Sequence, residues 1–461
     1  MTDITQTSEY KTIPEQLGRL VSVSMPCPEI TLAGFLRHAR QENQPRFYWE
    51  SNRDHVAFAG FGTAVEIMEW GEERFQDIER RARELFDTSV VLDENEPLAA
   101  PRLFGGFAFR DDFVPDAAWA DFTPAHFVLP HYQLVSINGD KWLTINAHIP
   151  IDDSPDDYLA ELREALVERI ELLRETEQTR FDPAQQTASE VNYPMPFETW
   201  STNISAATTR MKNGELNKVV LSRVAEVRFA YPVDIDGALG YLADHYAECY
   251  RFLFEPRPGR AFYGATPELL AGVHGRIVSS MALAGSIKRG KTPDEDFDYA
   301  KTLLNDPKER YEHQLVVDAG KDRIGAITET LTVGETGLYK LSNIQHLYTP
   351  IEGRLKTDSG IVPVVAALHP TPALGGDPRD IAMQLIGEYE PVPRGWYAAP
   401  VGWIDRHMNG QFAVAIRSAV AQNQRVWMYA GAGIVKDSIP QNEWDETALK
   451  FRPMMEALGI K

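Results

Sequence analysis

The stretch GWIDRHMNGQFAVAIRSAV (402–420), followed by VWMYAGAGIV (426–435), decides the fold expected for this chain. Asn409–Gly410 lies between two apolar runs and is a strong signal for a β-hairpin turn, so strands are predicted over GWI, FAVAIRSAV and VWMYAGAGIV. Residues 218–229 (KVVLSRVAEVRF) are β-rich, and residues 251–286 hold short apolar runs broken by Gly and Pro, as in an antiparallel meander. The pattern predicts an α+β fold with long antiparallel strands, and not the alternating βαβ units of a doubly wound sheet.

Three helices are predicted beside these strands. Residues 154–175 carry one apolar stripe at three- and four-residue steps, and Ser and Pro open the segment as cap and first turn. Residues 306–309 (DPKE) resemble a capping box that opens a helix into HQLVVDAGKDRI. Ser438 and Pro440 are expected to open a last helix through EWDETALKFRPMMEAL. The polar, Pro-rich residues 176–196 are interpreted as a linker and as the best candidate for a domain boundary.

Composition narrows the class of protein. The chain has 461 residues, enough for two or three domains at roughly 100–200 residues each, and a formal net charge of −21, which argues against general nucleic-acid binding but not against a local basic pocket. Its two cysteines, Cys27 and Cys249, suggest free thiols and no disulfide framework. The polar N-terminus lacks a signal pattern, and no apolar run approaches the ~18 residues of a membrane span. A cytoplasmic protein that binds neither nucleic acid nor membrane is expected.

The last predicted helix carries an acidic face. Glu443, Glu446 and Lys450 are spaced i, i+3, i+7 and therefore share one side of a helix. This face is either solvated or part of a site for a hard cation, since Mg²⁺ prefers carboxylate oxygens and water. Glu312 on the helix after 306–309 is a possible partner from a distant part of the chain. By contrast, Gly431-Ala-Gly433 is no dinucleotide fingerprint, because Lys436 stands where the third glycine would be.

Residues from about 197 to 457 resemble the chorismate-utilising enzymes, the family of isochorismate, salicylate, anthranilate and aminodeoxychorismate synthases. The similarity is carried by ten ordered segments: KVVLSR (218–223), FYGATPELL (262–270), ALAGSIKRG (282–290), ERYEHQLVVD (309–318), NIQHLYTPIEG (343–353), LHPTPALGG (368–376), RGWYAAPVGW (394–403), AIRSA (415–419), YAGAGIV (429–435) and EWDET (443–447). The resemblance implies a layered, mostly antiparallel sheet core with outer helices, as in anthranilate synthase component I. Residues 1–190 are expected to form a variable N-terminal part of this fold and residues 191–461 the chorismate-binding region, both within one integrated domain.

Three positions indicate which branch of the family the chain is similar to. Lys218 resembles the lysine that activates water in isochorismate and salicylate synthases, where the ammonia-using members carry Gln. Ala284 stands where aminodeoxychorismate synthases carry a nucleophilic lysine, and Ala373 stands where salicylate-forming relatives tend to have Thr. The resemblance therefore implies an isochorismate synthase, an isomerase. Alternatives are a salicylate synthase, which adds pyruvate elimination, and a non-catalytic member that serves as a binding subunit.

The resemblance also implies the chemistry. Water attacks C2 of the chorismate ring while the C4 hydroxyl leaves, so one face needs a base and the other an acid. Lys218 is the expected general base, which requires a lowered pKa, and Glu268 is the expected general acid, whose pKa an apolar pocket would raise. Taken alone, each residue could equally be an ordinary polar side chain at the end of a strand.

The implied cofactor is Mg²⁺, with Glu312 and Glu446 as principal ligands and Glu443 close by, directly or through water. His346 resembles a histidine that orients the substrate or excludes water, although a hydrogen-bonded core histidine remains an alternative. The other substrate-binding residues implied by the resemblance are Ala373, Tyr397, Arg417, Gly431, Gly433 and Lys450. No amidotransferase subunit is expected, the chain is expected to be a monomer or weak dimer, and the RGWYAAP segment favours the menaquinone branch over siderophore biosynthesis.

Overall fold

The computed structural model describes residues 18–92, 96–177 and 188–460. The α-helices are α1 (Leu32–Gln41), α2 (Arg74–Asp87), α3 (Leu159–Glu177), α4 (Phe197–Lys212), α5 (Ile235–His245), α6 (Pro293–Asn305), α7 (Pro307–Ile327), α8 (Ile361–Leu368), α9 (Arg379–Tyr389) and α10 (Pro440–Ala457). Short 3₁₀ helices lie at Pro97–Ala99, Ala117–Trp119 and Pro155–Tyr158. These helices accompany 23 strands in two sheets.

Within the described ranges the strands form a large sheet of 13 strands and a small sheet of 10. The large sheet contains, in spatial order, β10 (Ala188–Asn192), β11 (Lys218–Phe229), β23 (Arg425–Ile434), β22 (Ser418–Gln422), β13 (Arg260–Thr266), β12 (Tyr250–Arg257), β2 (Arg46–Ser51), β3 (Val56–Phe61), β8 (Tyr132–Ile137), β9 (Asp140–Pro150), β1 (Gly18–Pro26) and β5 (Val90–Leu92), with β19 (Gly376–Asp377) beside β11. The small sheet contains β16 (Thr328–Val333), β18 (Ile344–Leu355), β15 (Ile277–Lys288), β14 (Leu269–His274), β21 (Gly410–Val414), β20 (Pro400–Asp405), β6 (Arg102–Phe107), β7 (Ala125–Leu129) and β4 (Val65–Glu69), with β17 (Gly337–Lys340) beside β18. Apart from the parallel pair β1–β5, the described strand pairs are antiparallel, so the predicted α+β class with antiparallel strands is confirmed.

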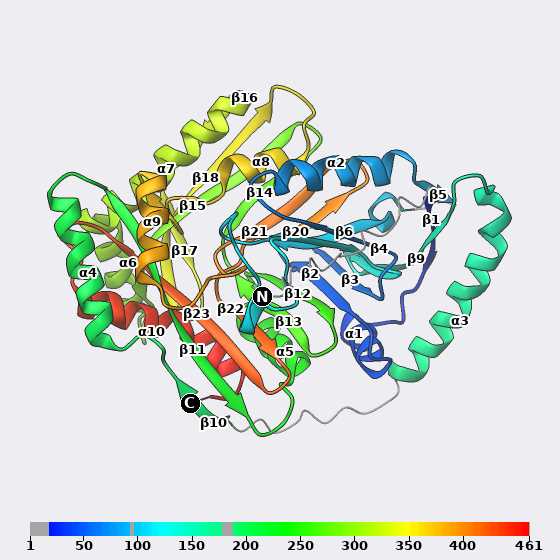
Figure 1. Ribbon diagram of the computed structural model, residues 1–461, viewed down its shortest axis with the longest axis horizontal. Helices are drawn as coiled ribbons and strands as arrows, with labels where there is room; N and C mark the ends of the chain where they lie inside the picture. The colour runs from blue at the N-terminus through cyan, green and yellow to red at the C-terminus, as the bar shows by residue number, and fades with distance from the viewer. Residues whose placement is uncertain (1–17, 93–95, 178–187, 461) are drawn as a thin grey trace, which may run out of the picture.

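The two sheets pack against each other over a shared aromatic core. Phe47 of the large sheet stacks on Phe104 of the small sheet with ring centroids 6.5 Å apart, and Phe58 meets Trp403 edge to face at 5.2 Å. Figure 1 shows α4, α9 and α10 beside β11 and β23 at one end of the molecule, with α1 and α3 at the other. Helix α7 packs on β15 of the small sheet and α10 packs on β23 of the large sheet. The two helices therefore bring side chains to the same end of the two-sheet core.

The chain passes from one sheet to the other at two places that the sequence pattern did not reveal. The predicted meander of 251–286 is two hairpins in different sheets, since β13 ends at Thr266 in the large sheet and β14 begins at Leu269 in the small one. The predicted strand FAVAIRSAV is likewise two strands, β21 and β22, which belong to the small and the large sheet. The two passages lie side by side, because the Val414 amide donates to the Glu268 carbonyl.

The hairpin predicted at Asn409–Gly410 exists, but its turn lies earlier. Strand β20 ends at Asp405, Gly410 already pairs with Ile404, and the positive φ falls on Met408 at 58°. The Asp405 carboxylate accepts from the amides of His407 and Asn409 and so shapes the turn by itself. A longer turn closed by an aspartate therefore replaces the expected two-residue Asn-Gly turn.

The predicted helices are present with corrected ends. Asp306 caps α7 by accepting from the amides of Lys308 and Glu309 at 2.8 and 3.1 Å, but the other half of the predicted capping box does not form, because the Asp306 amide donates to the Thr302 carbonyl and Glu309 accepts from Ser286. The last helix begins at Pro440, but Ser438 does not cap it, because its hydroxyl accepts from the Val435 amide instead. The segment 154–175 starts as a 3₁₀ turn and becomes α-helical from Leu159.

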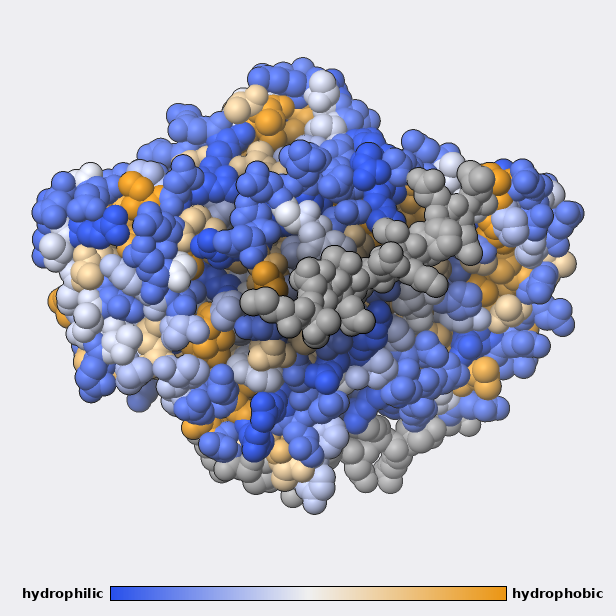
Figure 2. Space-filling view, viewed as in Figure 1, coloured by the Kyte–Doolittle hydropathy of each residue, from blue (hydrophilic) through white to orange (hydrophobic). Residues whose placement is uncertain are grey.

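The segment interpreted as a linker, 176–196, is only partly irregular. Helix α3 extends to Glu177, and β10 pairs with β11 at the edge of the large sheet, while residues 178–187 lie outside the described residues. Both cysteines are buried and free, as expected. Among the described helices none is long and apolar enough to span a membrane, and the face in Figure 2 is mostly hydrophilic with scattered hydrophobic residues.

Candidate active site

A buried cavity lies where the two sheets, the two passages between them and helices α7 and α10 meet. Its walls combine strand residues of both sheets with loop residues of the segments 370–376 and 394–399. The residues lining it are Val220, Glu268, Leu283, Ala284, Gly285, Ser286, Glu312, His346, Ala373, Leu374, Tyr397, Ile416, Arg417, Gly431, Gly433, Glu446 and Lys450. Of the twelve residues predicted for the site, ten line this cavity. The other two, Lys218 and Glu443, form ion pairs with Glu312 and Lys308, respectively.

Lys218 opens β11 and is completely buried. Its ammonium lies 2.9 Å from Oε1 of Glu312 on α7. Gly433 on the neighbouring strand β23 allows this pair to form, because a Cβ there would stand 2.2 Å from Glu312 Oε1 and 3.0 Å from Lys218 Cε. Although burial raises the pKa of Glu312, Lys218 lowers it below its usual value, so Glu312 is a carboxylate. The strand end thus delivers a buried amine to an acidic helix face.

Glu268 occupies the passage between β13 and β14 and is 3% exposed. Burial raises the pKa of Glu268 to about 8, although Lys218, Arg417 and Lys450 lower it. The side chain is therefore protonated at neutral pH and can give up a proton inside the cavity. This is the electrostatic state that the general-acid prediction required.

Arg417 occupies the other passage, between β21 and β22, and has a left-handed backbone with φ of 50°. Its guanidinium is 6% exposed and, within the described part of the chain, has no carboxylate partner; it reaches Nε2 of His346 at 3.5 Å. Burying a guanidinium without a counter-ion costs free energy, and a bound anion would remove this cost by neutralising the charge. The cavity is therefore suited to an anionic ligand whose carboxylate the planar Arg417 fork can hold.

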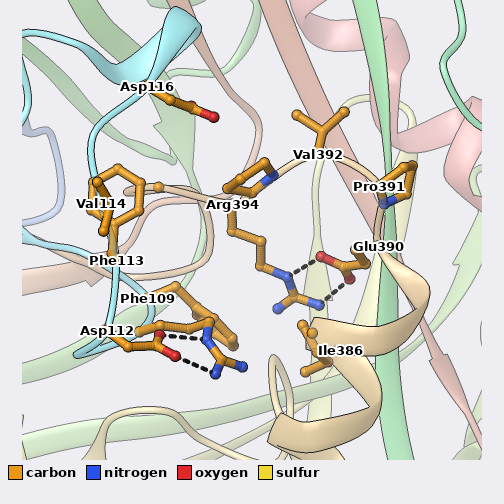
Figure 3. Close-up of a pocket in the computed structure, with 14 residues that line it drawn as sticks. Phe109, Asp112, Phe113, Val114, Asp116, Ile386, Glu390, Pro391, Val392 and Arg394 are labelled. Carbon is orange, nitrogen blue, oxygen red and sulfur yellow. Dashed lines mark hydrogen bonds and ion pairs between the residues drawn. The ribbon is translucent and has the colours of Figure 1, made fainter. Parts of the chain in front are cut away.

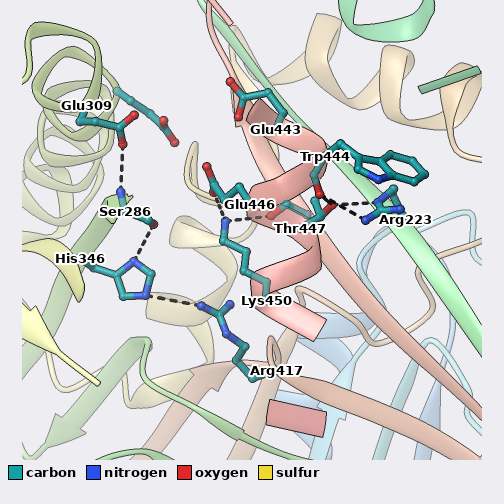
Figure 4. A network of polar contacts seen from close by, with 12 residues as sticks. Arg223, Ser286, Glu309, His346, Arg417, Glu443, Trp444, Glu446, Thr447 and Lys450 are labelled. Carbon is teal, nitrogen blue, oxygen red and sulfur yellow. Dashed lines mark hydrogen bonds and ion pairs between the residues drawn. The ribbon is translucent and has the colours of Figure 1, made fainter. Parts of the chain in front are cut away.

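His346 on β18 is neutral and fixed in one tautomer. Burial, followed by the charges of Arg417 and Lys450, lowers its pKa well below the usual value. Because a guanidinium only donates, Nε2 must accept from Arg417, and the proton therefore resides on Nδ1, which donates to the Ser286 hydroxyl at 2.8 Å. The Ser286 amide in turn donates to Glu309 at 2.9 Å (Figure 4), so one polar chain joins β15, β18 and α7.

Helices α7 and α10 each bring a pair of glutamates to this end of the molecule, and Glu312 and Glu446 line the cavity; we call Glu309, Glu312, Glu443 and Glu446 the acidic cluster. Each pair is spaced i, i+3 on its helix, Glu309 and Glu312 on α7 and Glu443 and Glu446 on α10. Burial, reinforced by Glu312, raises the pKa of Glu309 to about 7, and burial, reinforced by Glu446, raises that of Glu443. The carboxylates are thus close enough to repel one another.

Lysines balance part of this repulsion. Lys308 lies 3.0 Å from Glu443 and 3.5 Å from Glu309, and Lys450 pairs with Glu446 at 2.5 Å while donating to the Gly431 carbonyl at 2.9 Å. In the described part of the chain no three acidic, His or Cys side chains stand close enough to enclose an ion as they are. Carboxylate oxygens are the donors that a hard dication such as Mg²⁺ selects, so the acidic cluster fits such an ion by its chemistry.

Sequence reasoning missed Glu309, Ser286 and Lys308. Glu309 carried a usable signal, since it precedes Glu312 by one helical turn, as Glu443 precedes Glu446. Ser286 carried none, because its role depends on the pairing of β15 with β18, where it lies opposite His346. Tyr397, expected at the site, lines the cavity. Its ring stacks on that of Tyr429 with centroids 5.0 Å apart, and its hydroxyl oxygen lies 3.3 Å from the position that a Cβ at Gly431 would take.

A second cavity lies between residues 109–116 and the end of α9, and Arg394 connects it with the first (Figure 3). Arg394 pairs with Glu390 and donates to the carbonyls of Val220 and Leu374, which line the first cavity. Arg110 at its mouth is paired with Asp112. The arginines of the second cavity are thus already paired with carboxylates, unlike Arg417, so the first cavity is the candidate active site.

The two-sheet α+β fold and the buried acid, amine, free guanidinium and acidic cluster define an enzyme site for an anionic substrate. The family described as chorismate binding enzyme matches residues 6–459. Isochorismate synthase MenF of Bacillus subtilis is 33% identical over 449 residues, which cover 95% of this chain and 93% of the relative. The chain belongs to the chorismate-binding enzyme family.

Further relatives agree with this membership. The salicylate biosynthesis isochorismate synthase of Pseudomonas aeruginosa is 36% identical over 421 residues, 90% of this chain and 85% of the relative. The solved structure of MenF, the menaquinone-specific isochorismate synthase from Escherichia coli, superposes with a TM-score of 0.80 at 25% identity and covers 96% of both chains. Anthranilate synthase component I from Streptococcus pneumoniae shares the fold, with a TM-score of 0.71 at 22% identity over 88% of this chain and 93% of that one. The similarity therefore extends over residues 1–190 as well.

Proposed function

We propose that this protein is an isochorismate synthase, an isomerase that converts chorismate reversibly to isochorismate with Mg²⁺. The single observation that carries the proposal is the cavity in which a protonated Glu268, a buried Lys218 and an uncompensated Arg417 meet above the acidic cluster. The relatives named as isochorismate synthases over 85% or more of their length support the same reaction. The MenF relatives favour the menaquinone branch.

The proposed mechanism assigns one proton transfer to each side of the ring. Lys218 is the proposed base for the water that attacks C2, a role in which the ammonium now paired with Glu312 must first give up its proton, and Glu268 gives its proton to the C4 hydroxyl as this leaves. Arg417 holds a substrate carboxylate with its fork, and the neutral His346 accepts from Arg417 and keeps the guanidinium in place. Tyr397 and the backbone at Gly431 and Gly433 line the part of the cavity proposed for the enolpyruvyl group.

Mg²⁺, when bound, would anchor the ring carboxylate and withdraw charge from the conjugated system as a Lewis acid. Glu312 and Glu446 are its proposed ligands, with Glu443 and Glu309 beside them. Lys450 adds positive charge next to Glu446 and fixes the Gly431 carbonyl. We further propose that residues 1–190 and 191–461 act as one unit, without an amidotransferase subunit, as a monomer or weak dimer.

Product analysis tests the reaction. Purified protein is incubated with chorismate and Mg²⁺, with and without ammonium, and the products are identified by NMR. Isochorismate in both incubations is expected. Salicylate with pyruvate would identify a salicylate synthase, and no turnover would identify a non-catalytic member, so either result overturns the proposal.

Lys218→Ala tests the role of the base. We expect turnover to fall by about 10²–10⁴-fold, the usual contribution of general acid–base catalysis. The substitution also leaves Glu312 without its buried partner, so the unfolding midpoint is measured in parallel and turnover is compared at a temperature where the variant is folded. Turnover within tenfold of the wild type would remove Lys218 from the base role.

A further inference from the structure

Lys308 is the one lysine at the acidic cluster to which the proposed mechanism gives no task. It is the second residue of α7, its ammonium lies 3.0 Å from Glu443 and 3.5 Å from Glu309, and its side chain is 28% exposed. Glu443, its nearer partner, is 1% exposed. Burying a carboxylate to this degree without a positive partner is costly, and Lys308 supplies such a partner at 3.0 Å.

The charges of the cluster show what Lys308 contributes. Four carboxylates face three ammonium groups, since Lys218 pairs with Glu312, Lys450 with Glu446, and Lys308 with Glu443 and Glu309. Lys218 is fully buried in β11, and Lys450, which lines the cavity, is fixed by the Gly431 carbonyl. Lys308 stands at the rim, on a flexible stem at a helix start, so it can move while the two glutamates stay.

We propose that Lys308 is the counter-cation of the acidic cluster: it neutralises Glu443 and Glu309 while the divalent ion is absent, and its charge weakens the binding of that ion. The inference rests on the proposed function insofar as the acidic cluster is taken as the Mg²⁺ site. A positive charge next to the ligands repels a dication, and it also competes for the same carboxylate oxygens. Lys308 thereby keeps the metal-free enzyme folded and Mg²⁺ exchangeable.

Calorimetric titration of the substrate-free protein with MgCl₂, at pH 8 and constant ionic strength, tests the proposal without turnover. Lys308→Met keeps the length of the side chain and removes the charge, and Lys308→Arg keeps the charge. Lys340→Met is the matched control, because Lys340 makes a 2.9 Å ion pair with Asp296 away from the cluster. We expect Lys308→Met to bind Mg²⁺ about tenfold more tightly than the wild type, and the other two variants to stay within about twofold.

Thermal unfolding gives an independent readout. Without Mg²⁺, Lys308→Met is expected to melt below the wild type, and saturating Mg²⁺ is expected to raise its midpoint by more than it raises that of the wild type. If Lys308→Met does not fold, the double variant Lys308→Met/Glu443→Gln, which removes both partners, takes its place, and its metal-free midpoint is expected to return towards the wild type.

Unchanged or weaker Mg²⁺ affinity in Lys308→Met, or an equal change in Lys340→Met, overturns the proposal. Absence of Mg²⁺ binding by the wild type also overturns it, and the product analysis then shows separately whether isochorismate formation stands. Conversely, tighter Mg²⁺ binding by Lys308→Met in a protein that does not convert chorismate supports the counter-cation and overturns the proposed function.

Discussion

Glu268 is a buried acid whose pKa is raised to about 8 by burial, so it is protonated at neutral pH. Glu268 lies in the passage between β13 and β14 and is 3% exposed. The positive charges of Lys218 and Arg417 act on it, but it forms no ion pair with any of the described residues. An amide has nearly the same shape as a protonated carboxyl group. Substitution by Gln therefore separates the proton from the packing.

Glu268→Gln is expected to lower kcat by about 10²–10⁴-fold, because the leaving hydroxyl no longer receives a proton. At pH 5, close to the ordinary pKa of 4.5 with which Glu268 ionises in the unfolded chain, the unfolding midpoint should stay close to that of the wild type. Isochorismate formation and thermal unfolding are measured on the same preparation, with Glu352→Gln, an exposed position on β18, as the control. A kcat within tenfold of the wild type would exclude Glu268 as the general acid.

The same substitution predicts a pH dependence of stability. A glutamate with the ordinary pKa of 4.5 ionises in the unfolded chain, whereas folded Glu268 keeps its proton to about pH 8. Between these values the unfolded state binds fewer protons, so the free energy of unfolding of the wild type falls as pH rises, by up to about 1 kcal/mol per pH unit. Glu268→Gln has no such loss. Urea unfolding at pH 5 to 9 should therefore show the free energy of unfolding of the variant, relative to that of the wild type, rising up to pH 8 and then staying constant. A constant difference would contradict the raised pKa.

At this scale the sequence was most informative where a resemblance supplied the residue. Lys218, Glu268, Glu312, His346 and Arg417 were expected and are found around one cavity. Composition alone gave no reason to choose them, because a lysine at a strand end and a glutamate after Pro267 look like ordinary surface residues. Their burial depends on the second sheet, which no local pattern describes.

At the scale of single elements, β11 and β23 set the spacing between the base and the acidic cluster. Val220 pairs with Gly433 and Ser222 with Gly431, so both glycines lie opposite the start of β11. A Cβ at Gly433 would meet Glu312 Oε1 at 2.2 Å, whereas a Cβ at Gly431 has its nearest neighbours at 3.3 Å. Alanine substitutions at Gly433 and Gly431 can therefore be compared on the same strand, since only the one at Gly433 displaces Glu312.

Gly433→Ala is expected to lower kcat/KM by at least about 100-fold, because the Lys218–Glu312 pair must move by an amount that enzymes rarely tolerate. Gly431→Ala is expected to cost less, since its neighbours need to yield only a few tenths of an ångström. Steady-state kinetics with chorismate, together with circular dichroism as a check on folding, measure both variants. Equal effects at the two positions would mean that the Lys218–Glu312 distance is not what limits turnover.

Elements were predicted better than their ends and faces. The start of α7 at its Asp306 cap and the proline start of α10 are local signals and were predicted correctly. The capping box itself was only half right, since Glu309 accepts from Ser286, and Ser438 was wrong because its hydroxyl closes a turn before the helix. The sequence carries no signal for the division of FAVAIRSAV between two sheets, since its apolar residues continue through the point where the chain changes sheet. Which sides of α7 and α10 meet depends on contacts more than a hundred residues apart.

For the whole molecule, the seam between β2 and β12 joins residues before and after 190 within one sheet. Arg46 on β2 pairs with Glu255 on β12 at 2.5 Å and with Asp236 at 2.6 Å, and the side chains of Arg46 and Glu255 are 3% and 4% exposed. Removing one partner of such a buried ion pair greatly lowers the free energy of unfolding, because the remaining charge stays buried without its counter-ion.

Arg46→Met is expected to lower the free energy of unfolding by about 3–5 kcal/mol, because Glu255 is left buried without a counter-ion and keeps only the hydrogen bond from the Gly259 amide. The double variant Arg46→Met/Glu255→Gln should recover part of this loss, and urea unfolding measures both. A loss below about 1 kcal/mol for the single variant would show that the seam does not depend on this ion pair. The sequence could not foretell the seam, because pairing across two hundred residues has no local signal.

The two sheets also have a mechanical consequence for catalysis. Lys218 belongs to the large sheet and His346 to the small one, while Glu268 and Arg417 are fastened where the backbone crosses between them. Rings such as Phe47 and Phe104, which hold the layers apart, act as spacers for the reacting groups although they touch no substrate. Trimming them would tilt one layer against the other, so laboratory evolution of this catalyst should find its rate-changing substitutions in the hydrophobic interior as readily as in the cavity wall.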